Sequence, residues 1–182
     1  MRARALAAIA TLAVATAGLG LAGTALAQPG ATAHEIPQSL AVEHAETLDR
    51  LTELSKHPGE VGATARKALD LYRQHQAREL EYILPPLTLL PVLADGKVTP
   101  DMAWAVTMAD RVKADRELIF AEHTKVTDIA NALLDAGRRA HDPEAIEFAK
   151  AAVTDSLNDI ELLEPTVLVI GDYVRARLPA AQ

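Results

Sequence analysis

Apolar residues recur every three or four positions along four long stretches of this 182-residue chain. That spacing places them on one face of an α-helix, so each stretch is expected to form an amphipathic helix. Segments that contain proline or glycine separate the stretches, which span residues 37–56, 60–84, 100–136 and 143–178. Because helices joined by short links lie antiparallel, the sequence predicts an all-α fold, an antiparallel up-down-up-down four-helix bundle over residues 37–178.

Proline, glycine and aspartate mark where these helices should begin and end. Pro85 is expected to end the regular part of the second helix, because its ring clashes with the preceding turn and it has no N–H to donate. Gly137 is a C-terminal signal for the third helix. Asp142 and Pro143 suit the N-cap and the first turn of the fourth helix. Pro165 lies inside the fourth stretch, where we expect a local disturbance of the helix.

The first 27 residues have the layout of a secretory signal peptide. Arg2 and Arg4 precede an apolar run over residues 5–22, and small residues at Ala25 and Ala27 form a cleavage pattern. The alternative is a retained membrane helix, but glycine and threonine interrupt the run and no anchor flanks it. We therefore expect cleavage after residue 27, a flexible leader over residues 28–36, and a periplasmic or secreted protein with no membrane association after cleavage.

Charge and cysteine content limit the possible partners and ligands. Removing the two arginines of residues 1–27 changes the formal net charge from −7 to −9. Such an acidic chain is unsuited to nucleic acid or anionic lipid. The chain contains no cysteine, so it has neither disulfides nor thiolate metal ligands.

The second half of the chain repeats the first in degenerate form. Residues 75–85 align with residues 155–165 at an offset of 80, and residues 42–44 align with residues 121–123 at an offset of 79. The first helix pair is therefore expected to be a duplicate of the second, related to it by a pseudo-two-fold axis.

The repeat contains ionisable residues that continue the apolar faces of the predicted helices. His75 and Glu79 are four residues apart, as are Asp155 and Asp159 in the aligned segment. Because residues four apart lie on the same helix face, both pairs should point inward. Together with one histidine from each remaining helix, the inward set is His44, His75, Glu79, His123, Asp155 and Asp159.

A metal ion would account for this set. Unpaired charges inside a bundle each cost several kcal/mol, and three imidazoles cannot satisfy three carboxylates fully. Nitrogen and oxygen donors without thiolate suit iron, manganese or zinc, and six ligands from four helices suffice for two bridged ions. One inward histidine or one HxxxE pair would more simply be a core residue or a chance match, so the prediction depends on the combination.

The pattern resembles the hemerythrin-like (HHE cation-binding) family, whose members carry His, HxxxE, His and HxxxE/D on successive helices. The best-matching segments are residues 41–51, 71–87 and 120–134. The resemblance implies that His44, His75, Glu79 and His123 are iron ligands, with Glu79 as a bridge. It also implies a non-haem di-iron centre that binds dioxygen or handles iron, peroxide or nitric oxide.

The chain departs from the family pattern on its third and fourth helices. Asp155 stands where the fourth helix should carry histidine, and Thr127 stands where oxygen carriers place a further histidine. Extra carboxylates stabilise oxidised metal, which favours oxidase-like or iron-handling chemistry over reversible oxygen carriage. Two alternatives remain open: a metal-free interaction module that has lost its site, and a single zinc or manganese ion held by His44, His75, Glu79 and His123.

Overall fold

The computed structural model describes residues 34–178, and within this range it is helical with no β-strand. The predicted signal peptide and most of the predicted leader lie outside the described residues. None of the helices between residues 34 and 178 combines the length and apolar character needed to cross a membrane.

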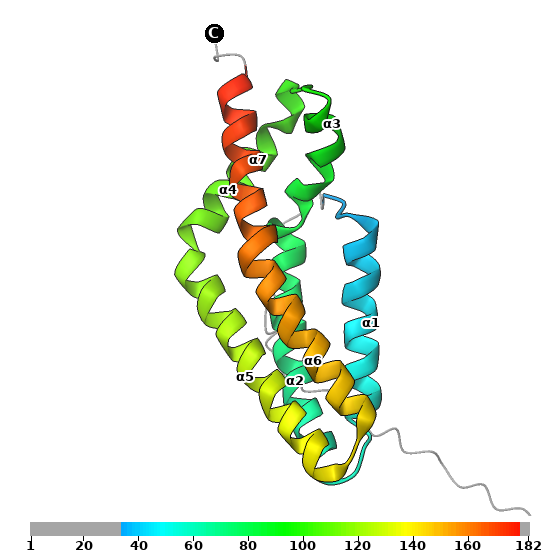
Figure 1. Cartoon of the computed structure of the whole chain (residues 1–182). Helices are drawn as coiled ribbons and strands as arrows, with labels where there is room; N and C mark the ends of the chain where they lie inside the picture. Colours follow the sequence, from blue (N-terminus) through cyan, green and yellow to red (C-terminus); the bar gives the residue numbers. More distant parts are fainter. Residues whose placement is uncertain (1–33, 179–182) are drawn as a thin grey trace, which may run out of the picture. The chain divides into compact units, whose positions relative to one another are not determined.

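The four predicted stretches are helical, and two further short helices over residues 85–94 lie between the second and third stretches, where no helix was predicted (Figure 1). The first half comprises α1 (Gln38–Leu54), α2 (Gly59–Arg78), the π-helix η1 (Glu79–Ile83), the 3₁₀-helix η2 (Pro85–Leu89) and α3 (Leu90–Ala94). The second half comprises the 3₁₀-helix η3 (Pro100–Met102), α4 (Ala103–Ala114), α5 (Arg116–Ala140), α6 (Pro143–Asn158), the π-helix η4 (Asp159–Leu163) and α7 (Glu164–Arg177).

Each long helix packs against neighbours from both halves of the described chain. α1 contacts α2 and α6, α2 contacts α5, α5 contacts α6, and α4 contacts α7 (Figure 1). The apolar core consists of two clusters, one around Leu51, Ala65 and Leu133 and the other around Tyr82, Ile119 and Val167. Along α2, α5 and α6 the residues between these clusters are polar and buried, so a polar layer separates the two parts of the core.

A π-helix occurs at the same place in both repeats. η1 begins at Glu79 and η4 begins at Asp159, which is the aligned residue. In each, the residue five positions on donates its N–H to the first carbonyl, Leu84 to Glu79 at 2.9 Å and Glu164 to Asp159. A proline follows both π-helices, and the widened turn relieves the clash of its ring with the turn before it. The predicted disturbance near Pro165 is confirmed.

The third predicted helix is not one continuous helix ending before Gly137. It is interrupted at Asp115, whose carboxylate accepts a hydrogen bond from the Tyr82 hydroxyl at 2.9 Å, and α5 continues to Ala140. The helix ends through His141, which has the left-handed φ of 54°. The N–H groups of His141 and Asp142 bond to the carbonyls of Arg138 and Gly137, as in a Schellman motif.

Gly137 is buried in this last turn for a packing reason. A Cβ atom built at Gly137 would lie 3.1 Å from the Cβ of Ala145 and 3.2 Å from Cγ1 of Ile146. The glycine therefore allows α5 to approach α6 closely, and it was wrong to read it as a stop. Asp142, in contrast, is the predicted N-cap, because its carboxylate accepts the N–H of Ala145 at 3.1 Å.

Candidate metal centre

Four predicted residues converge in the buried polar layer: His75, Glu79, His123 and Asp159. They come from α2, η1, α5 and η4, and one donor atom of each lies within 4.8 Å of the donor atoms of the others. The first three are buried and Asp159 is partly buried. Three helical stretches that are distant in sequence therefore present nitrogen and oxygen donors to one point.

Glu79 lies at the centre of the contacts in this layer. One of its carboxylate oxygens, Oε2, lies 3.0 Å from Nε2 of His44, and the other, Oε1, lies 3.2 Å from Nε2 of His75. The Nδ1–H of His44 donates to the carbonyl of Leu40 at 2.8 Å, which fixes the ring so that Nε2 faces the carboxylate. The two oxygens of this one carboxylate therefore face two different imidazoles.

Electrostatics couple these groups strongly. Burial alone would raise the pKa of Glu79, but the hydrogen bonds with His44 and His75 outweigh it and hold the pKa below its ordinary value. Burial alone would lower the pKa of each histidine, and the contact with Glu79 raises it instead. The carboxylate thus favours protonation of the two imidazoles, and a metal cation can take the place of those protons.

The surroundings of Asp159 disfavour the ionised form of its carboxyl. Burial raises the pKa of this carboxyl, and the negative charge of Glu79 raises it further. The nearby His75 and His44 oppose this shift but do not overcome it. An ionised Asp159 therefore lacks sufficient positive charge around it, as expected of a carboxylate that binds a cation.

His123 is oriented by α6. Ser156 directs its hydroxyl toward the carbonyl of His123 at 3.5 Å, so its oxygen accepts from the Nδ1–H of the same histidine at 3.2 Å. The ring of His123 meets that of His75 edge-on, with centroids 4.5 Å apart. The remaining nitrogen, Nε2, is buried without a hydrogen-bond partner.

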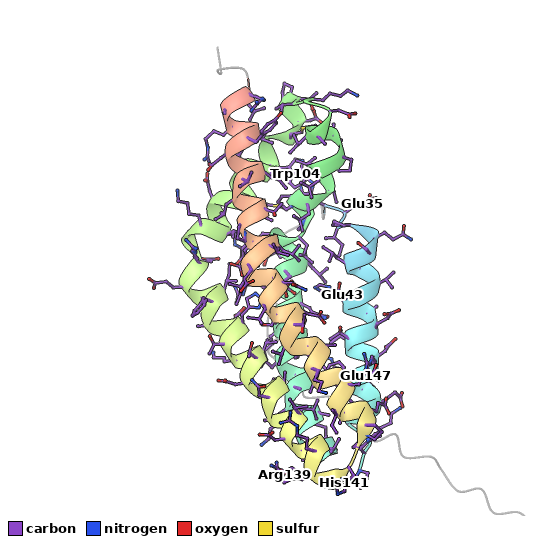
Figure 2. All side chains as sticks on the ribbon, in the orientation of Figure 1. Glu35, Glu43, Trp104, Arg139, His141 and Glu147 are labelled. Carbon is purple, nitrogen blue, oxygen red and sulfur yellow. The ribbon has the colours of Figure 1, made fainter. Side chains whose placement is uncertain are left out.

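A cavity of about 60 Å³ leads to the layer from the surface between α1 and α6. Glu43, which Figure 2 labels on α1, is exposed and lines the cavity together with the partly buried Asp155. Burial raises the pKa of Asp155, as it does that of Glu43. The hydroxyl of Tyr72 is buried at this cavity without a hydrogen-bond partner.

The six predicted residues therefore occupy different places. His75, Glu79, His123 and Asp159 form the group of converging donors. His44 adjoins this group through its contact with Glu79, while Asp155 lines the cavity outside it.

Two buried polar groups beside His123 were not predicted, Ser156 and Glu164. Ser156 and Glu164 both contact His123, at 3.2 Å in each case. The alignment of the repeats contained a signal for Glu164, because it aligns with the buried Leu84 just before the shared proline. The alignment contained no such signal for Ser156, because its aligned residue, Gln76, is polar and its burial could not be expected from the sequence.

The donor set fits a metal ion. Three buried atoms have no hydrogen-bond partner among the described residues: His75 Nδ1, His123 Nε2 and Glu164 Oε1. Buried polar atoms without partners are rare in proteins. Imidazole and carboxylate donors suit several divalent metals, including iron, manganese and zinc. The buried cluster can therefore hold a metal ion, whose identity these donors alone do not determine.

No protein-family model, curated protein or solved structure matches this chain. The candidate metal centre is therefore defined by the geometry of its own residues.

Proposed function

We propose that this chain is an exported, hemerythrin-like four-helix bundle that holds a non-haem di-iron centre. Its centre would bind dioxygen or handle iron, peroxide or nitric oxide in the periplasm. The observation that carries the proposal is the convergence of His75, Glu79, His123 and Asp159, whose donor atoms lie within 4.8 Å of one another in a buried layer.

The helix packing supports the bundle part of the proposal. The helical stretches α1, α2 with η1, α4 with α5, and α6 with η4 and α7 follow one another along the chain. Their contacts close a ring, because α1 contacts both α2 and α6 while α5 contacts both α2 and α6. The matching π-helices support the duplication, since they begin at the aligned residues Glu79 and Asp159.

Two lines of evidence favour two ions over one. The oxygens of Glu79 face His44 and His75 separately, which suits a carboxylate that bridges two cations. His123 and Asp159 provide donors from the other repeat, so each half of the duplicated fold contributes an imidazole and a carboxylate. Iron, when bound, would supply redox chemistry toward small oxidants, and the many carboxylates favour its oxidised state.

The protein around the centre limits what can reach it. A cavity of about 60 Å³ admits a few waters or a diatomic molecule, but not a sizeable organic substrate. Burial raises the pKa of Tyr72 above its ordinary range, so the phenol keeps its proton. Its unpartnered hydroxyl is available to donate a hydrogen bond to a small ligand in the cavity.

The test is the metal content of the mature protein together with its optical spectrum. We expect about two irons per chain after anaerobic loading with Fe(II), and visible charge-transfer absorption after oxidation. A variant with His75→Ala and Glu79→Ala should retain no iron. Protein that stays metal-free after loading would contradict the proposal and favour the interaction module. One zinc or manganese ion per chain would support the single-metal alternative.

A further inference from the structure

Glu164 is a buried carboxylate beside the proposed centre. It is the first residue of α7, directly after the π-helix η4, and its side chain is only 10% exposed. Its Oε1 lies 3.2 Å from Nε2 of His123. Within residues 34–178, neither the Glu164 oxygen nor the His123 nitrogen has a hydrogen-bond partner, so the two atoms face each other without hydrogen-bond geometry.

The orientation of His123 makes Nε2 its metal-binding atom. The Nδ1–H of the ring donates to Ser156, and the Ser156 oxygen also contacts the Thr127 hydroxyl at 3.2 Å. A hydrogen bond of this kind fixes the tautomer of a neutral histidine and leaves the other nitrogen with a free lone pair. That lone pair is on the atom that faces Glu164.

The Glu164 carboxylate has no permanently charged cation to balance it. Among the described side chains, no lysine or arginine lies within 4 Å of this carboxylate, and the basic group beside it is the imidazole of His123. Burying a carboxylate without a lysine, an arginine or a metal ion beside it is unfavourable. The fold does not require a charge here, because the aligned residue of the other repeat is Leu84, which is 1% exposed.

We propose that Glu164 is a further protein ligand of the metal centre and binds the same ion as Nε2 of His123. The inference rests on the proposed metal-binding function. Two donors that each lie about 2.1 Å from one cation must stand about 3 to 4 Å apart, and the observed separation of 3.2 Å agrees. Through Glu164, α7 would also contribute a ligand to the centre. The Thr127 hydroxyl on α5 is not free in the same way, because it is already bonded to Ser156.

A titration of the metal-free mature chain with Co(II), followed by visible absorption, tests this role. We expect Glu164→Gln to weaken Co(II) binding at least about tenfold. Even groups that only hydrogen-bond to a metal ligand contribute that much to metal affinity. The visible bands of bound Co(II) should also change, because they report its ligands. Glu161→Gln is the matched control: Glu161 lies on η4 but is exposed, so both affinity and spectrum should stay as in the parent protein.

A second variant separates metal binding from folding. Glu164→Leu introduces the residue of the other repeat, so the metal-free protein should be at least as stable as the parent in urea while binding Co(II) more weakly. Unchanged affinity and spectrum in Glu164→Gln would overturn the assignment, as would weaker binding with an unchanged spectrum, which indicates action through His123. If the parent binds no Co(II), or if His75→Ala with Glu79→Ala binds it normally, the proposed function itself fails.

Discussion

At the scale of single residues, the candidate metal centre contains groups that stabilise the metal-free fold and groups that destabilise it. The negative charge of Glu79 is compensated, because two imidazoles contact its two oxygens. Asp159 is not compensated, because its burial and the charge of Glu79 both act against ionisation. Conflicts of this kind between stability and local charge are typical of functional sites.

Asp159→Asn should therefore stabilise the metal-free protein at pH 7, by about 1–3 kcal/mol. The pKa of Asp159 is raised from about 3.8 in the unfolded chain to about 8 in the folded protein, so burying this carboxyl costs free energy at neutral pH. The cost is fully present above the folded pKa, decreases as the pH falls between the two pKa values and vanishes below the unfolded pKa, so the advantage of the variant should shrink between pH 7 and pH 5. Urea unfolding at the two pH values measures it, and a less stable variant at pH 7 would contradict the explanation.

Asp142→Ala should have the opposite effect and cost about 1–2 kcal/mol at pH 7. The carboxylate of Asp142 caps α6 and accepts the Nδ1–H of His57 at 2.6 Å. Burial would raise the pKa of Asp142, but the bonds from Ala145 and His57 lower it overall. The contribution is thus fully present above the unfolded pKa near 3.8 and is lost as the pH falls through the folded pKa.

Urea unfolding of Asp142→Ala against pH checks this prediction. Asp135→Ala provides the control, because Asp135 is exposed on α5 and pairs only with Arg138 on its own helix. A variant of Asp142 that unfolds with the same midpoint as the control would show that the cap contributes nothing measurable.

At the scale of the helices, periodicity and proline placed the elements but did not define their geometry. The 3.6-residue pattern located the helical stretches because it reports which face is buried. It could not distinguish α from π turns, since one extra residue in a turn changes the register only locally. The shared proline after Glu79 and Asp159 was therefore read as a stop in one repeat and as a disturbance in the other.

Glycine was misread for a related reason. A glycine near the end of a helical pattern commonly supplies the left-handed C′ position, but at Gly137 it allows close packing against Ala145 instead. The left-handed position is filled by His141, one of the non-glycine residue types that adopt this conformation most readily. Sequence alone does not show which helix faces a given glycine.

Gly171 makes a closer contact of the same kind between α7 and α4. A Cβ atom at Gly171 would lie 2.2 Å from the Cβ of Ala109, so the two helices would have to separate. Gly171→Ala should destabilise the protein by about 1–3 kcal/mol through this overpacking. Adding Ala109→Gly makes room and should recover part of the loss. Chemical unfolding of both single variants and the double variant gives the coupling, and strictly additive effects would contradict the predicted contact.

At the scale of the whole described fold, the metal centre divides the core into two apolar clusters. It gathers donors from α2, η1, α5 and η4, so a bound ion would cross-link helices from both repeats. A bound ion would therefore stabilise the bundle.

Metal binding should raise the free energy of unfolding by about 2.7 kcal/mol at a free metal concentration 100 times Kd. Thermal unfolding with and without a chelator measures the difference. His75→Ala should remove the metal dependence, because it deletes a donor of the four-residue group. A parent protein whose melting temperature ignores both metal and chelator would show that no cross-link forms.

The sequence predicted the all-helical fold class and the four converging residues. Acidic and imidazole side chains stand out because they interrupt the apolar face of an amphipathic helix. The sequence did not separate Asp155 from Asp159. Both continue the same face of α6, but Asp155 lies one turn earlier, and only Asp159 belongs to the four-residue group. The sequence also missed Glu164, which directly follows the π-turn that begins at Asp159.

The most direct test of the metal centre is a crystal structure of the iron-loaded protein with anomalous scattering data collected at the iron edge. We expect anomalous density in the buried layer, within bonding distance of His75, Glu79, His123 and Asp159. Anomalous density only at surface sites, or none beside these four residues in crystals soaked with Fe(II), would contradict it.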